Sequence, residues 1–328
     1  MDIEKSNEMI AIVIPYYKLE FFEETLQSLK NQTDKRFKVY IGNDSSPEDP
    51  QFLLDKFKGA FEYNYHIFDS NLGGTSLVKQ WHRCIALTEN EDWIMILGDD
   101  DVLSDNVVEL FYKNEKEIKE KNVNVVRFAT KVINEKGEVV LDKFTHPVLE
   151  NAQDFLTRKF SKKTRSSLSE HLFKKEIVED KKFKDLHLAW HSDDLAILEF
   201  STPNFIYSIN DAHLLIRVSN LSITGDASTN DRKNWATFQF CEILFTEYSL
   251  LFTKFQKKII LQKLEVAFLN IPSFATYKTM IAYHFKQIGF ISAIQFQLRL
   301  IKYKIILILK KLKIFTAVYA VYAKIVKK

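Results

Sequence analysis

Residues 93–101 read WIMILGDDD, a short apolar run that ends in three adjacent carboxylates. A run of this length, bounded by polar residues, is typical of a buried strand in a parallel sheet. Three neighbouring carboxylates repel one another, so they require either full solvation or a cation that neutralises them. Because alternate residues of an extended chain point the same way, Asp99 and Asp101 suit one hard divalent cation or the diphosphate oxygens that it holds. A solvated acidic turn that caps the next helix is the alternative, and the triplet alone leaves both open.

The sequence before this stretch alternates between strand and helix patterns. Apolar, β-branched runs predict strands at residues 9–15, 37–41 and 63–68, and amphipathic patterns predict helices at residues 19–32, 49–57 and 76–87. This alternation predicts an α/β fold with a mostly parallel central sheet and helices on its faces.

Polar clusters follow each of the predicted strands. They are Tyr16 and Tyr17, then Asn43-Asp44, then Asn71 to Gly74, and finally the acidic triplet. In open parallel sheets, ligands bind beyond the carboxyl ends of the strands, so we expect these four loops to meet at one edge. Each loop alone also suits an ordinary turn, and Asn43-Asp44 has the composition of an Asx-turn.

The sequence after the triplet is mixed. Strands are expected at residues 123–133 and 138–141, joined as a hairpin, and at residues 205–218; helices are expected at residues 152–160, 168–178 and 188–200, and from about residue 235 to the end. His191-Ser192-Asp193-Asp194 opens the third of these helices, and its two acids are candidates for a general base. Capping of the helix N-terminus is the alternative role for both acids.

Cysteine content and the N-terminal sequence indicate an intracellular protein. Cys84 and Cys241 are the only cysteines, and two distant thiols form neither a disulfide framework nor a zinc site. Residues 1–5 lack the basic flank and long apolar core of a signal peptide. We therefore expect the chain to be cytoplasmic.

Five motifs in order resemble family 2 glycosyltransferases of the GT-A fold, of the bacterial surface-polysaccharide type. The resemblance covers about the first 105 residues and lies at residues 12–17, 29–33, 43–46, 71–73 and 97–101. Ser192 to Leu195 resembles the later acidic motif of the family with less specificity. The resemblance implies a GT-A catalytic domain over residues 1–225, with a nucleotide-sugar half to about residue 105, followed by a helical region over residues 226–328.

The resemblance also implies roles for individual residues. The donor would be a nucleotide-diphosphate sugar, with a UDP-sugar favoured, and Mn²⁺ or Mg²⁺ would assist transfer with inversion. Asp44 would contact the nucleoside base, Asp99 and Asp101 would be the ends of an Asp-x-Asp motif, and Asp101 would bind the metal directly. Asp193 would be the catalytic base, with Asp194 as a close alternative. Pro15, Tyr17, Asn43, Asn71, Gly73 and Asp100 complete the expected donor site.

The sequence departs from the family pattern at three points, and one arginine is a further candidate for the donor site. Asn43 stands where the family usually has a second acid, and Trp81-His82 stands where it often has Asn. The Gln-x-x-Arg-Trp motif of processive synthases is absent, which favours transfer of a single sugar to a glycan or lipid-linked acceptor. Arg217 is a candidate contact for the diphosphate, although a structural arginine is the favoured alternative.

The C-terminal tail is strongly basic. No Asp or Glu follows Glu265, whereas 11 of the 46 Lys and Arg residues do, so the preceding chain carries a net charge of −8. Residues 296–313 alternate apolar and basic residues, a pattern that predicts a helix lying on an anionic membrane surface, since neither half of the tail is long enough to span one. We expect peripheral attachment to the inner face of the cell membrane, with packing on the body as the alternative. Nucleic acid is a poor partner because the body is acidic.

Two other classes of protein remain open from the sequence. A nucleotidyltransferase would use a similar sheet and metal site, but it usually has a glycine-rich basic loop after the first strand, and residues 15–19 contain no glycine. A non-catalytic nucleotide-sugar-binding protein at the membrane is the second alternative.

Overall fold

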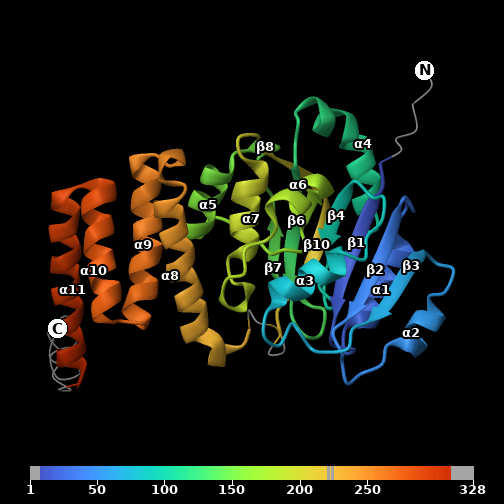
Figure 1. Cartoon of the computed structure of the whole chain (residues 1–328), viewed down its shortest axis with the longest axis horizontal. Coiled ribbons are helices and arrows are strands. Elements are labelled where there is room, and N and C mark those ends of the chain that lie inside the picture. The colour runs from blue at the N-terminus through green and yellow to red at the C-terminus, as the bar shows by residue number, and fades with distance from the viewer. Residues whose placement is uncertain (1–7, 220–221, 223–224, 312–328) are drawn as a thin grey trace, which may run out of the picture. The chain divides into compact units, whose positions relative to one another are not determined.

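The computed structural model describes residues 8–219, 222 and 225–311. The chain forms two compact units, Met1–Phe240 and Cys241–Lys328, and the division falls within helix α8 (Asn230–Thr246). The sequence suggests an earlier boundary, at residue 225. Figure 1 shows the first unit as a central sheet flanked by helices and the second as a set of helices.

The first half of the sheet is parallel and confirms the expected alternation. Its strands are β1 (Ile10–Tyr16), β2 (Phe37–Asn43), β3 (Glu62–Ile67) and β4 (Trp93–Ile96), in the spatial order β3-β2-β1-β4. The intervening helices are α1 (Phe22–Asn31), α2 (Gln51–Lys56) and α3 (Leu77–Ile85). Because β1 lies between β2 and β4, the chain reverses its direction of travel across the sheet at β1. Such a reversal leaves a crevice beyond the carboxyl ends of the strands.

The second half of the sheet is mixed. It contains β5 (Val102–Leu103), β6 (Val125–Ile133), β7 (Val139–Phe144), β8 (Leu149–Glu150), β9 (His171–Lys174) and β10 (Ile206–Arg217). Strands β6 and β7 form the expected antiparallel hairpin, and β10 runs parallel to β6. The helices of this half are α4 (Val107–Glu120), α5 (Ala152–Phe160), α6 (Lys175–Lys181) and α7 (Ser192–Ser201), with short turns η1 (His187–Ala189) and η2 (Ala227–Thr229).

The prediction of a helix at residues 168–178 is wrong for the first half of this range. Residues 171–174 form β9, which joins the two halves of the sheet by pairing antiparallel with β4 and with β6. Leu172 and Phe173 are fully buried, one on each face of the sheet. A buried strand of four residues is too short to show its periodicity, so the helix that follows it dominated the pattern.

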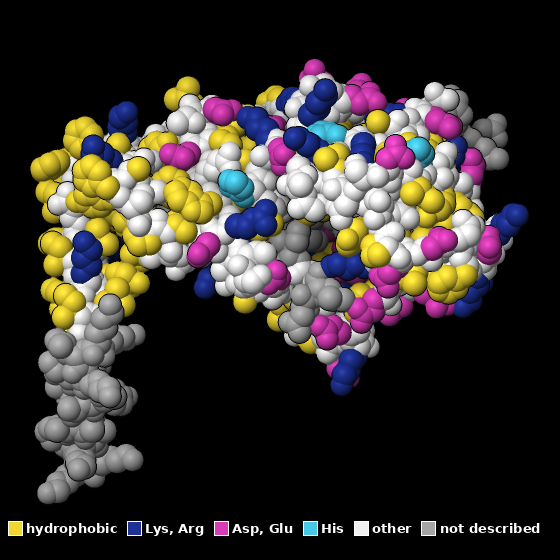
Figure 2. Space-filling model, turned by 60° about the horizontal axis from the view of Figure 1, so that its bottom comes forward, with side chains coloured by type: hydrophobic (Ala, Val, Ile, Leu, Met, Phe, Trp, Pro, Cys, Tyr) yellow, Lys and Arg dark blue, Asp and Glu magenta, His cyan; other side chains and the backbone are white. Residues whose placement is uncertain are grey.

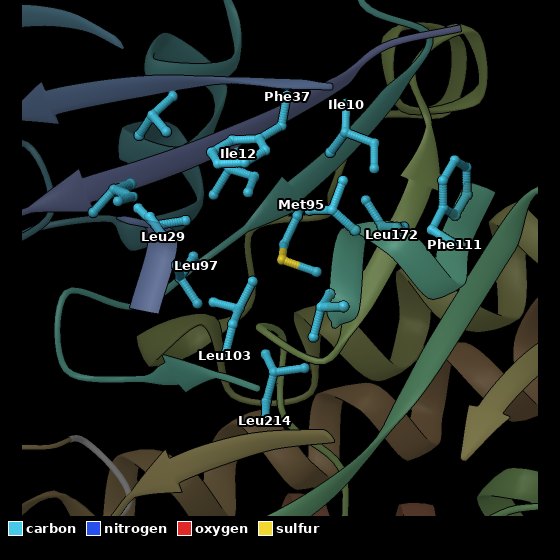
Figure 3. Packing of buried hydrophobic residues seen from close by; sticks show 14 of the residues in the cluster. Ile10, Ile12, Leu29, Phe37, Met95, Leu97, Leu103, Phe111, Leu172 and Leu214 are labelled. Atoms are coloured by element: carbon cyan, nitrogen blue, oxygen red, sulfur yellow. The ribbon is translucent and has the colours of Figure 1, made fainter. Parts of the chain in front are cut away.

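The core of the first unit lies between one face of the sheet and the helices that cover it. Ile10, Ile12 and Ile14 occupy alternate positions of β1 and belong to this core, together with Leu29 of α1 and Met95 of β4. Figure 3 shows Ile10, Ile12, Leu29 and Met95 within it. Each of these side chains is almost completely excluded from solvent. The packing favours one strand register, because a shift of one residue would put the smaller Ala11 and Val13 where isoleucines fill this core.

The second unit consists of α9 (Lys254–Asn270), α10 (Phe274–Tyr283) and α11 (Phe290–Lys311), preceded by the turn η3 (Ser249–Leu251). A π-helical turn, η4 (His284–Ile288), connects α10 to Gly289, whose φ of 130° ends it. Capping boxes at Thr253 and Ser273 start α9 and α10. Phe268, Met280 and Phe296 form the centre of the packing. No helix among the described residues combines the length and apolar character needed to cross a bilayer.

We predict that Leu29→Ala lowers the free energy of unfolding by about 2–5 kcal/mol, because it leaves a cavity in the core beneath the sheet. Phe52→Ala on α2 is the matched control: Phe52 is 62% exposed, so its loss should change stability by less than about 0.5 kcal/mol. Urea denaturation followed by tryptophan fluorescence measures both. Equal losses for the two variants would contradict the assignment of Leu29 to the core.

Candidate active site

A cleft of about 310 Å³ opens beyond the carboxyl ends of the parallel strands. Six of the predicted donor-site residues line it: Pro15, Tyr17, Asp44, Asn71, Gly73 and Asp99. Lys18, Leu188 and Arg232 line it as well and were not predicted. The loops after β1, β2, β3 and β4 therefore meet at one edge of the sheet, as the strand order requires.

Asp99 fastens the loop after β1 to the end of β4. One carboxylate oxygen, Oδ2, accepts hydrogen bonds from the backbone N–H groups of Tyr17 and Lys18, each at 2.8 Å. Burial raises the pKa of Asp99 above its ordinary value, and the two backbone N–H groups oppose that rise. Asp99 thus shapes the wall of the cleft, and its predicted role toward donor or metal remains a prediction.

Asp100 and Asp101 bring carboxylate oxygens together over Gly98. A Cβ at position 98 would approach within 2.9 Å of Asp100 Oδ1 and 3.1 Å of Asp101 Oδ2, so the absence of a side chain there makes room for both oxygens. Burial first, and then the charges of Asp101 and Asp99, raise the pKa of Asp100 to about 8. Burial also raises the pKa of Asp101. Two crowded oxygens in a buried site are a donor set that fits a hard divalent cation.

The described side chains alone do not supply a complete set of ligands for a cation. Among the residues that the structure describes, no three His, Cys, Asp or Glu side chains are grouped to hold a metal ion. Asp101 Oδ1 already accepts the backbone N–H of Arg217 at 3.0 Å. A cation held by Asp101 and Asp100 would therefore require most of its remaining oxygens from a ligand or from water.

Arg217 is a structural arginine. Its side chain is fully buried, and it donates to the carbonyl oxygens of Asp100 at 3.1 Å and Asn134 at 3.0 Å, and to Glu24 Oε2 at 2.6 Å. The guanidinium carbon also lies 4.2 Å from the centroid of the Phe21 ring. These contacts support the structural role that the sequence favoured. They hold the backbone of the acidic triplet, and nothing in them supports contact with a diphosphate.

Asp44 organises the turn at residues 71–74. Its two oxygens accept the backbone N–H groups of Leu72 at 2.7 Å and Gly73 at 2.8 Å, and it forms an ion pair with Arg83. A Cβ at position 73 would lie 2.6 Å from Asp44 Oδ2, which explains why glycine occupies this position. The carboxylate is buried against protein groups, and contact with a nucleoside base remains a prediction.

Asn43 and Asn71 have local roles that suit the turns considered from the sequence. Asn43 Oδ1 accepts the backbone N–H of Ser46 at 2.8 Å, and its amide donates to the Tyr65 hydroxyl at 2.7 Å. Asn71 Oδ1 accepts the backbone N–H of Gly74 at 2.6 Å. Asn71 therefore shapes the edge of the cleft through its own turn, and Asn43 closes the turn after β2 and bonds to β3.

The segment before α7 has an unusual backbone. Leu188, Ala189 and His191 have φ values of 59°, 53° and 69°, in the left-handed region that non-glycine residues rarely adopt. Leu188 lines the cleft, and His191 directly precedes α7. Strained residues of this kind are retained where surrounding contacts fix them, and they concentrate at functional sites.

The two acids at the start of α7 have different surroundings. Asp194 is fully buried: Lys159 Nζ lies 2.6 Å from Oδ1, and His191 Nδ1 lies 2.6 Å from Oδ2. Burial alone would raise the pKa of Asp194, but Lys159 and His191 outweigh burial and hold this pKa far below its ordinary value. Asp193 is partly exposed, and burial together with the charge of Asp194 raises its pKa to about 7. Asp194 is therefore the anchored anion, and Asp193 is the acid that can exchange a proton near neutral pH.

His191 is fixed on both sides. Its Nε2 lies 3.1 Å from Thr237 Oγ1, and its ring stacks on Phe240 with centroids 4.8 Å apart. Thr237 and Phe240 belong to the part of α8 that lies in the first unit. The middle of α8 thereby holds His191, which in turn holds Asp194 beside the candidate base.

Several residues of the site carried no signal in the sequence. Lys159 and Arg83 carry no pattern that marks them out on their helices, and only the fold brings them to Asp194 and Asp44. Ser169, whose Oγ accepts the Gly98 N–H at 3.0 Å, lies in a loop far from the triplet in sequence. No spacing rule relates partners so distant along the chain.

A parallel half-sheet in the order β3-β2-β1-β4, with acidic residues at its reversal point and a mixed second half carrying an acid pair, defines the GT-A class of fold. Residues 11–172 match the family described as Glycosyl transferase family 2, and this part of the chain belongs to that family.

Relatives agree with this assignment. Over 121 residues the chain is 24% identical to the glycosyltransferase GlyG of Streptococcus pneumoniae, a match that spans 37% of this chain and 38% of that protein. Residues 1–349 of S. aureus TarS, solved with UDP-GlcNAc, share the fold with a TM-score of 0.60 and 16% identity, over 84% of this chain and 79% of that one. A second TarS structure has a TM-score of 0.60 and 14% identity, over 85% of this chain and 50% of that one.

We predict that Lys159→Met lowers the free energy of unfolding by about 3–5 kcal/mol, because it leaves the Asp194 carboxylate buried without its cation. The loss should be largest above the ordinary pKa of an aspartate and should shrink in acid, where Asp194 can bind a proton. Lys163→Met, at an exposed position three residues beyond the end of α5, is the control and should be close to neutral. Denaturation curves at neutral and acidic pH test this prediction. A loss that does not diminish in acid would contradict the ion-pair explanation.

Proposed function

We propose that the chain is a metal-dependent, inverting glycosyltransferase that moves one sugar from a UDP-sugar to a hydroxyl of a glycan or lipid-linked acceptor. The observation that carries the proposal is the pairing of two acidic centres in one GT-A unit. One is a crowded triplet at the reversal point of the sheet, and the other is an acid pair in which Asp193 can exchange a proton near neutral pH. Membership of residues 11–172 in the glycosyltransferase family supports the reaction type.

The donor class rests on the cleft and on a structural relative. TarS has been solved with UDP-GlcNAc and with UDP. The cleft in this chain offers two cationic side chains, Lys18 and Arg232, next to the glycine-rich turn at residues 71–74. Cationic groups and close backbone approach suit a nucleoside diphosphate. We therefore favour a UDP-hexose or UDP-N-acetylhexosamine as donor.

Asp101 and Asp100 would hold the cation, with Asp99 shaping the loop beside them. When bound, Mn²⁺ or Mg²⁺ neutralises negative charge on the departing diphosphate. Asp193 accepts the proton of the acceptor hydroxyl while the hydroxyl oxygen forms a bond to the anomeric carbon of the donor sugar. The bond between this carbon and the diphosphate breaks on the opposite face. Displacement from the opposite face inverts the configuration. Asp194 does not exchange this proton, because Lys159 and His191 hold it ionised and in place.

We predict that Asp101→Ala lowers the rate of nucleoside diphosphate release by roughly 100- to 10,000-fold, since it removes a carboxylate that holds the cation. The assay is a screen of UDP-, GDP- and dTDP-sugars with Mn²⁺. Asp105→Ala is the control: this carboxyl is exposed, and the variant should retain full activity. Equal rates for Asp101→Ala and the wild type would contradict the metal role. Absence of release with every donor and acceptor would favour a non-catalytic binding protein.

We predict that kcat/KM rises with pH through about 7 and levels off above it, because only the ionised form of Asp193 accepts a proton. Asp193→Asn should lose this acidic limb together with roughly 100- to 10,000-fold of the rate. The Asp194→Asn protein should unfold more readily than the wild type, because the substitution leaves Lys159 buried without an anion. A rate that does not change across neutral pH, or an Asp193→Asn enzyme with the wild-type profile, would assign the base to another group.

A further inference from the structure

Helix α11 carries an apolar face that no other described residue covers. Only one side of the helix packs inward, through Ala293 and Phe296, which are 6% and 2% exposed. A second side consists of apolar residues that are each between 42% and 71% exposed: Ile291, Ile294, Leu298, Ile301, Ile305 and Ile308. Their spacing of three and four residues places all six on one stripe of the helix. We call these six residues the apolar stripe.

Basic side chains flank the apolar stripe. A helix turns by about 100° per residue, so Lys302 lies at one edge of the stripe and Lys304 at the other. Both lysines are exposed. Arg299 lies on the same side as Lys302 and is bonded through Nε to Glu265 at 3.1 Å. No acidic residue follows Glu265 in the sequence, so nothing on α11 itself opposes this positive charge.

The apolar surface continues beyond the stripe. A groove of about 650 Å³ between α10 and α11 is lined by apolar side chains, among them Phe274, Tyr277 and Ile301, with Lys304 beside them. Phe274 is 71% exposed at this groove. Figure 2 shows hydrophobic side chains gathered over the described C-terminal helices, with Lys and Arg side chains between them. An exposed apolar patch of this kind marks an interaction site.

We propose that the apolar stripe of α11 and its flanking lysines form a membrane-binding surface that docks on an anionic lipid bilayer. Apolar side chains enter the boundary between headgroups and acyl chains while the lysines remain at the level of the lipid phosphates. A second copy of this chain is a poorer occupant, because pairing two stripes would bring their lysines together and juxtapose like charges. The inference does not depend on the proposed reaction, since it uses no residue of the cleft.

Co-sedimentation of the full-length protein with vesicles tests the proposal. Vesicles of phosphatidylcholine mixed with phosphatidylglycerol should pellet the protein, and vesicles of phosphatidylcholine alone should pellet much less of it. Binding should weaken as salt increases, because the lysine contribution is screened. The proposal would be overturned if both kinds of vesicle pelleted the protein equally, or if neither kind pelleted it.

Two pairs of variants separate the apolar and the charged contributions. Ile301→Gln with Ile305→Gln should weaken vesicle binding by roughly tenfold or more. Lys302→Gln with Lys304→Gln should weaken it by roughly 20- to 30-fold, from about 1 kcal/mol for each charge near the surface. The matched controls are Val139→Gln with Leu141→Gln, which are 53% and 51% exposed on β7, and the exposed pair Lys113→Gln with Lys116→Gln on α4. Both controls should bind like the wild type.

Sedimentation velocity and circular dichroism complete the test. All variants should keep the helical content of the wild type, because the changed side chains are exposed. A wild-type dimer that dissociates on Ile301→Gln with Ile305→Gln, without any vesicle binding, would show that the stripe joins two copies of the chain. Vesicle binding that is unchanged in both stripe variants would place the membrane contact elsewhere.

Discussion

Repulsion among the carboxylates at the end of β4 is the constraint on which the cleft depends. Asp99, Asp100 and Asp101 are adjacent and largely withdrawn from water, so the surrounding fold has to compensate their charge or keep them protonated. The protein compensates two of them with its own groups. Backbone N–H groups bind Asp99, and the backbone N–H of Arg217 binds Asp101. The Asp99 contacts tie the loop after β1 to the end of β4, and the Asp101 contact ties the triplet to the end of β10. At Asp99, the bonds that compensate the charge also form part of the cleft wall.

A similar arrangement recurs at the acid pair of α7. At the start of α7, Asp194 is paired with Lys159 and His191, and its anchored charge raises the pKa of the neighbouring Asp193. In the triplet, burial together with the charges of Asp101 and Asp99 raises the pKa of Asp100. Adjacent acids with different partners thereby acquire different protonation states at one pH. That separation is what a reaction needs when one acid has to remain an anion and another has to accept a proton.

Much of the first half of the fold and the location of the site could be predicted from sequence. The apolar runs that contain β1, β2 and β4 are bounded by polar turns, and the order of these strands brings their loops to one edge. Strand β9 could not be predicted, because its four residues are stabilised by pairing with β4 and β6 and not by a local pattern. Lys159, Arg83 and Ser169 were missed for a related reason. The two cations pair with carboxylates that are distant in sequence, and Ser169 accepts the distant Gly98 N–H, so only the folded chain brings these groups together.

Residues that are named together in a sequence motif take separate roles in the structure. Asn43 and Asp44 are adjacent, yet Asn43 closes its own turn while Asp44 holds the turn at residues 71–74 and pairs with Arg83. The loop after β3 is thus positioned by a carboxylate from β2, and Gly73 is required because a Cβ there would collide with that carboxylate. A motif of acids and glycines at the edge of such a sheet consequently reflects two demands, recognition of a ligand and mutual attachment of the loops. Because the second demand is met by hydrogen bonds within the protein, the shape of the cleft is set before any donor binds, and the donor's binding free energy need not be used to order these loops.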